Sequence, residues 1–175
     1  MKLNNNVFLL VIVILIFGQS CKEAETKETQ KATVSDVEKL PGLWKLQAME
    51  QKDSLGNWSE WRGGMQGYLL YDGDKNMALH LLKKDYEKTD LRFPNFTDTI
   101  SEAALKHLTG SYIYIGNYKI LKDQNIVEHT RLSHSNPGDW GKVVQRRFSF
   151  QGDTLLVQPV EDKNASLRLK WLKEK

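Results

Sequence analysis

From residue 36 onward, the chain alternates short apolar runs with turn-forming residues, a pattern typical of an all-β protein. The residues "GDKN" between two of these runs predict a tight hairpin. Eight strands are predicted, at residues 43–51, 67–72, 77–84, 111–121, 125–133, 143–151, 154–160 and 165–173.

One segment interrupts this pattern. The residues "TISEAALKHLTG" (99–110) predict a helix between the third and fourth strands, with Thr99 and Glu102 as a capping box and Gly110 as the stop. Eight mostly antiparallel strands in simple succession avoid exposed edges best by closing on themselves. The predicted fold is therefore an eight-stranded, mainly antiparallel β-barrel with a helical insertion, wide enough for one small ligand.

Short motifs along the predicted barrel support this fold. In order, they are "GLWKL" (42–46), "GYLLYDGDKNM", "YIGNY", "VEH", "PGDWG" and "RRFSFQGDTL". Their order and spacing resemble the bacterial lipocalin-like domain family over roughly residues 40–172, and Gly-x-Trp alone resembles the signature of lipocalins and other calycins. The resemblance implies a calycin-type barrel with an internal apolar cavity, in a family whose biochemical role is largely undefined.

The N-terminus differs from the rest of the chain. After "MKLNNN" come twelve uncharged residues, "VFLLVIVILIFG". A membrane-spanning helix needs about 20 apolar residues, so residues 1–20 are predicted to be a signal peptide. The arrangement of Gly18, Ser20 and Cys21 resembles the lipobox of bacterial lipoproteins, although leucine is usual where Gly18 stands. The resemblance implies lipidation of Cys21; the alternative is an ordinary signal peptide and a stray thiol.

Residues 21–35 are charged and rich in threonine, which predicts a flexible tether before a barrel domain at residues 36–175. Two acyl chains on Cys21 would anchor the protein stably to the outer membrane of the bacterial cell envelope. The residues "KEAE" also resemble a signal for surface exposure. The net charge of +3 is too weak to indicate nucleic-acid binding, and we expect a monomer.

Strand phase selects the candidate residues of the barrel interior. Gly42 and Trp44 are expected at the barrel floor, with Leu46 and Ala48 on the same face as Trp44. The expected ligand-binding residues are Tyr112, Tyr114, His129, Arg146, Trp58 and Trp61, although each also has a structural interpretation.

Two details concern the phase of single residues. Arg131 shares a face with His129, whereas His134, five residues further on, is expected to face the opposite way. The family motif aligns with either Arg146 or Arg147, and phase selects Arg146. An arginine among apolar neighbours needs an acid, an aromatic ring or an anionic ligand.

The sequence favours a binding module for a small hydrophobic or amphipathic molecule. It contains no His-x-x-x-His pair, no Gly-x-Ser-x-Gly and no phosphate-binding glycine loop, so no metal or cofactor is expected. One alternative is an isomerase or hydrolase that uses His129 as acid or base and Arg146 to stabilise an anion. Another is a filled barrel that serves as a protein-interaction module and has no cavity.

Overall fold

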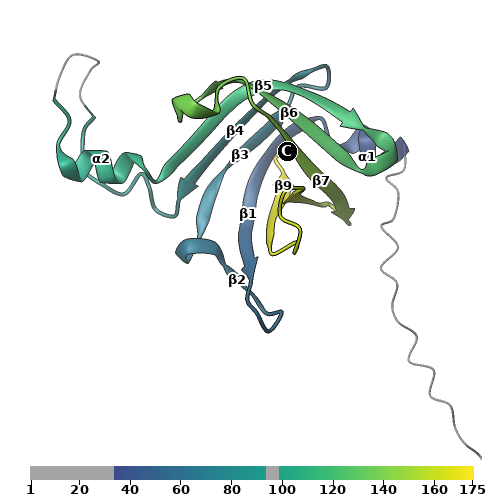
Figure 1. The fold of residues 1–175 in the computed structure, drawn as a ribbon, viewed down its shortest axis with the longest axis horizontal. Coiled ribbons are helices and arrows are strands. Elements are labelled where there is room, and N and C mark those ends of the chain that lie inside the picture. The colour runs from purple at the N-terminus through teal and green to yellow at the C-terminus, as the bar shows by residue number, and fades with distance from the viewer. Residues whose placement is uncertain (1–33, 94–98) are drawn as a thin grey trace, which may run out of the picture.

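The computed structural model describes residues 34–93 and 99–175 (Figure 1). The predicted signal peptide, Cys21 and most of the predicted tether lie outside these residues. The helices are α1 (Val34–Lys39) and α2 (Glu102–Leu108). The strands are β1 (Gly42–Lys52), β2 (Trp58–Glu60), β3 (Met65–Tyr71), β4 (Asn76–Lys83), β5 (Ser111–Leu121), β6 (Ile126–His134), β7 (Val143–Gln151), β8 (Thr154–Pro159) and β9 (Leu167–Lys173).

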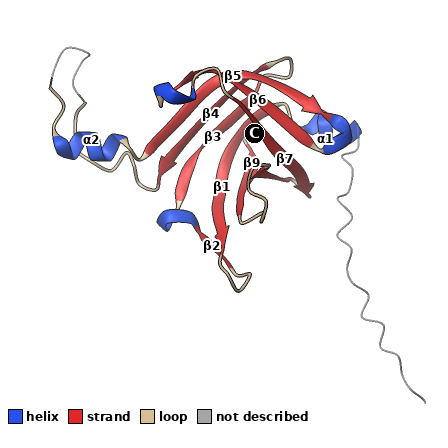
Figure 2. Cartoon of the chain, in the orientation of Figure 1, coloured by secondary structure: helices blue, strands red, loops and turns tan. Residues whose placement is uncertain are grey.

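The sheet closes on itself as an eight-stranded antiparallel barrel. From β3 to β9 each strand pairs with the next along the chain, and β1 pairs with both β3 and β9. The three-residue β2 pairs with the end of β1. Figure 2 shows the strands wrapping around one another, with α1 near one end and α2 projecting from the other. The predicted closed barrel is confirmed. Among the described residues, no helix has the length and apolar character needed to span a membrane.

Helix α2 lies between β4 and β5 in the chain and is shorter than predicted. Its N-cap is Ser101, which has an extended backbone and whose hydroxyl accepts a hydrogen bond from the Ala104 amide at 3.2 Å. The predicted capping box with Thr99 is therefore wrong. Serine two residues later meets the same chemical requirement and sits next to the first helical residue.

Trp44 closes the α1 end of the barrel. Its side chain is 2% exposed, and its indole Nε1 donates a hydrogen bond to the Leu40 carbonyl at 2.9 Å. This bond fixes the segment after α1 against the core. Gly42 beside it has a φ of 132°, a conformation that favours glycine.

A β-bulge changes the inward face of β1. Pairing with β9 shifts register between Leu46 and Ala48, so Met49 becomes buried and Ala48 only half-buried. The predicted face is correct for Trp44 and Leu46 and wrong for Ala48, because an extra residue in a strand reverses the alternation.

A second bulge matters more for the interior. On β6, Ser133 pairs with Ile115 while Arg131 pairs with Gly116, so Leu132 is the extra residue and is 55% exposed. As a result His134 is buried, as His129 is, and the expectation that the two histidines face opposite ways is wrong. Gly116 permits the close approach here, since a Cβ at this position would lie 1.9 Å from the Thr130 carbonyl oxygen.

Candidate functional site

A cavity of about 950 Å³ extends from the barrel interior through an open mouth to the α2 segment. Its mouth lies at the α2 end, where β4 ends and β5 begins, and α1 lies at the opposite end (Figure 1). The volume is in the range of small-molecule sites, so the barrel is not filled and the structure contradicts that alternative. Most of the wall is apolar, from Met49, Met65, Leu69, Leu79, Leu81, Val157, Leu167, Leu169 and Trp171.

His129 lies at the centre of a buried hydrogen-bond network. Its Nε2 is 2.8 Å from the Tyr71 hydroxyl, and its Nδ1 is 2.8 Å from the Tyr114 hydroxyl. A neutral imidazole has one donor and one acceptor nitrogen, so one tyrosine accepts a hydrogen bond and the other donates one. The network ties β6 to β3 and β5 and uses both ring nitrogens.

Burial keeps this imidazole neutral. Desolvation, reinforced by the positive charges of Arg146 and Arg131, lowers the pKa of His129 to about 3. Burial likewise raises the pKa values of Tyr71 and Tyr114, so both hydroxyls keep their protons at neutral pH. The network is therefore uncharged and fixed in place.

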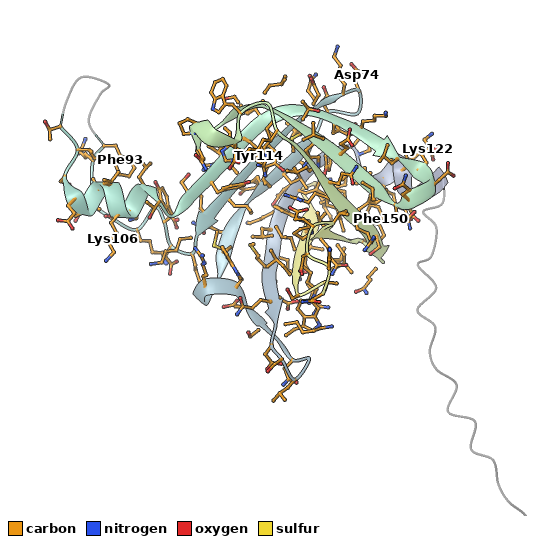
Figure 3. The ribbon with its side chains drawn as sticks, viewed as in Figure 1. Asp74, Phe93, Lys106, Tyr114, Lys122 and Phe150 are labelled. Atoms are coloured by element: carbon orange, nitrogen blue, oxygen red, sulfur yellow. The ribbon has the colours of Figure 1, made fainter. Side chains whose placement is uncertain are left out.

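The tyrosines of β5 differ in their surroundings. Tyr114 is 2% exposed and lies within the outline of the barrel in Figure 3, with its ring stacked on His134 at a centroid distance of 5.7 Å. The ring of Tyr118 packs against the ring of Tyr71, with a centroid distance of 4.7 Å. Tyr112 is only half-buried and lines the cavity together with Tyr114. Of the two β5 tyrosines that line the cavity, Tyr112 is therefore the more accessible.

Arg146 lines the cavity, as phase predicts, while Arg147 is exposed. The Arg146 Nη1 donates to both carboxylate oxygens of Glu161, at 2.9 and 3.0 Å. Glu161 also lines the cavity and its side chain is 61% exposed. Arg146 therefore already has an acidic partner.

Arg131 is a cavity residue absent from the candidates chosen by sequence. It is 6% exposed, and its Nη2 donates to the Tyr112 hydroxyl at 2.7 Å. Its guanidinium also lies over the Tyr114 ring, 5.0 Å from the centroid. Because Arg131 shares a strand face with His129, the sequence could have identified it as a residue of the barrel interior. No comparable signal existed for His134, because the bulge that turns it inward leaves no sequence pattern.

The two tryptophans of the β2 region have different surroundings. Trp61 lines the cavity at the mouth. Trp58 does not line it, and its ring instead packs beneath the Arg168 guanidinium at 3.9 Å and the Lys52 ammonium at 5.0 Å. In the part of the chain that the structure describes, no group of three or more histidine, cysteine, aspartate or glutamate side chains could hold a metal ion.

Comparison with known proteins agrees with this architecture. No curated protein and no solved structure matches the chain significantly. The family model of the lipocalin-like domain matches residues 41–173, which include all the strands of the closed barrel and nearly all of the described core. The chain belongs to the lipocalin-like domain family.

Proposed function

We propose that this protein is a membrane-anchored lipoprotein that binds a small hydrophobic or amphipathic molecule inside its barrel. The observation that carries the proposal is the cavity of about 950 Å³ with its mostly apolar wall. Removing an apolar ligand from water contributes roughly 25 cal/mol per Å² of buried apolar surface. The polar groups on the cavity wall, among them those of Tyr112, Arg131 and Arg146, would orient the ligand.

A catalytic role for His129 has less support. A general acid or base must exchange a proton with the reacting group near the working pH. Both nitrogens of His129 are occupied by tyrosine hydroxyls, and its pKa of about 3 removes the cationic acid form at neutral pH. The geometry therefore favours binding over acid–base catalysis at this residue.

Anchoring through Cys21 is compatible with access to the cavity. The first described residues form α1, which lies at the end of the barrel opposite the mouth (Figure 1). The twelve residues 22–33 span at most about 40 Å when fully extended. A lipid on Cys21 would therefore hold the barrel near the membrane, in our proposal the outer membrane, from the closed end.

Ligand identification tests the binding proposal. Residues 22–175, expressed in the source organism and purified without detergent, are analysed by native mass spectrometry, and any bound molecule is extracted and identified. We expect one apolar or amphipathic molecule per chain. A chain that carries nothing, and takes nothing up from a total lipid extract of the same cells, would contradict the proposal.

Metabolic labelling tests the anchor. Cells that produce the full chain are grown with an alkyne-tagged palmitate, and membranes are separated from soluble protein. We expect the label on the wild-type chain in the membrane fraction, and its loss in Cys21→Ser. A wild-type chain that is unlabelled and soluble would refute lipidation.

A further inference from the structure

The buried guanidinium of Arg131 is incompletely partnered. One donor binds the Tyr112 hydroxyl, but Nε is buried and has no hydrogen-bond partner among the described residues. The nearest carboxylate oxygen, on Asp139, lies 3.6 Å from Nη1, beyond hydrogen-bond distance. A buried cation that lacks close pairing costs free energy, so its persistence in a folded barrel indicates a missing partner.

Asp139 cannot supply that partner fully. Its Oδ1 lies 2.8 Å from the ammonium of Lys142, nearer than the 3.6 Å to Arg131. The carboxylate is therefore shared between two cations, and the closer one is exposed to solvent. The charge on Arg131 remains only partly balanced by the protein.

The charges around the cavity point the same way. Among the described cavity-lining residues, five carry positive charge and one, Glu161, carries negative charge. Glu161 is already paired with Arg146. The basic residues are Arg62, Lys83, Lys106, Arg131 and Arg146; Figure 3 places Lys106 on the arm formed by α2. A cavity with such an excess of positive charge favours an anion.

Tyr112 adds a second donor beside Arg131. Its hydroxyl oxygen accepts from the Arg131 Nη2, which leaves its own O–H proton free to donate. Burial raises the pKa of Tyr112, so the hydroxyl stays protonated at neutral pH. The guanidinium of Arg131 and the O–H of Tyr112 thus form a pair of neighbouring donors on the cavity wall. A carboxylate, with two acceptor oxygens, matches such a pair.

We propose that the ligand is an amphipathic carboxylate whose head group binds Arg131 and the Tyr112 hydroxyl while its alkyl part lies along the leucines of the barrel wall. This inference rests on the proposed binding function and specifies its ligand class. Arg146 contributes positive potential from the neighbouring strand but keeps Glu161 as its own partner.

A matched pair of probes tests the head group. Residues 22–175 are loaded with the neutral, apolar fluorophore N-phenyl-1-naphthylamine, which is then displaced by dodecanoate or by dodecanol. These probes share a chain length and differ in charge. Because a hydrogen bond to a charged group is stronger than a neutral one, we expect dodecanoate to bind at least about tenfold more tightly.

Substitutions assign the preference to Arg131. In Arg131→Met, dodecanoate and dodecanol should bind with similar affinity, and dodecanol should bind as it does to the wild type. Arg147→Met removes the same charge from an exposed position on β7 and should keep the wild-type preference. If Arg131→Met fails to fold, Tyr112→Phe carries the test, with a loss of about three- to tenfold for dodecanoate alone.

The outcomes separate this inference from the proposed function. Equal binding of both probes to the wild type, or a preference that survives both Arg131→Met and Tyr112→Phe, overturns the carboxylate site while leaving a hydrophobic binding protein. If neither the fluorophore nor either probe binds, the binding function itself is overturned, and this inference with it.

Discussion

The buried state of His129 predicts a specific loss of stability in mild acid. Burial of the imidazole, reinforced by the positive charges of Arg146 and Arg131, favours its neutral form, and Tyr71 on β3 and Tyr114 on β5 bind its two nitrogens. Its pKa falls from the ordinary value of 6.5 to about 3 on folding. Between these two values, the unfolded chain binds a proton that the folded chain does not, so stability decreases as the pH falls.

The size of this effect follows from the two pKa values. Below the pKa of His129 in the unfolded chain, each pH unit lowers the free energy of unfolding by about 1.4 kcal/mol, until the pH reaches the pKa of the folded state. Lowering the pH from about 7 to about 4.5 should therefore cost about 2 to 3 kcal/mol of unfolding free energy through His129 alone. Above about pH 7, the contribution is fully present and no longer changes.

A non-titrating substitution isolates this contribution. In His129→Gln, one amide can still donate and accept, so the two tyrosine hydroxyls keep possible partners. Urea unfolding followed by tryptophan fluorescence at both pH values gives the pH-dependent loss for each protein. We expect the loss to be about 2 to 3 kcal/mol smaller in His129→Gln.

Groups common to both proteins, including His134 and the carboxylates, cancel in this comparison. His80→Gln, on the outer face of β4, controls for the general effect of losing a histidine. The same pH-dependent loss in wild type and His129→Gln would refute the assignment of a neutral, buried imidazole.

Three further substitutions test the fold and the mouth of the cavity. Trp44→Phe removes the indole hydrogen bond to the carbonyl after α1 and should cost about 1 to 3 kcal/mol in urea unfolding; an unchanged midpoint would contradict the floor contact. Gly116→Ala places a Cβ against the neighbouring strand and should prevent a native circular-dichroism and exchange-protection pattern, whereas Gly138→Ala, whose Cβ would lie at an ordinary contact distance of 3.6 Å from the Asn136 Oδ1, should behave like the wild type. Trp61→Phe should reduce the fluorescence change on ligand binding, with Trp171 on the cavity wall still reporting, whereas Trp58→Phe should retain the full change; the reverse result would place the mouth elsewhere.

The sequence predicted the barrel well because its information is mostly local. Turn residues and apolar runs located all eight long strands to within a few residues, and simple succession implied closure. Phase also placed Trp44, Tyr114, His129 and Arg146 on the inner side, because alternation holds over an uninterrupted strand.

Bulges limited the prediction of the interior. An extra residue at Leu132 reverses the alternation, so His134 becomes buried beside Tyr114 rather than facing outward. The register shift before Ala48 exchanges that residue for Met49 in the core. Such shifts depend on pairing with a distant strand, so the local pattern does not contain them.

The roles of the polar residues depended on contacts between strands. His129 was expected to face a ligand, but two tyrosines from other strands occupy both of its nitrogens. Arg146 has an acidic partner from the segment after β8, whereas Arg131 lacks one close enough to form a hydrogen bond. Only the assembled barrel shows which arginine is incompletely paired.

The most direct test of the account compares the binding of an apolar fluorophore to the wild-type barrel and to a barrel whose cavity a larger side chain fills. Leu81→Trp adds bulk to the cavity wall, and Leu132→Trp adds the same bulk to the outer surface. The account predicts one N-phenyl-1-naphthylamine per chain in the wild type and in Leu132→Trp, and weak or no binding in Leu81→Trp. Equal binding by all three proteins would show that the ligand does not occupy the barrel.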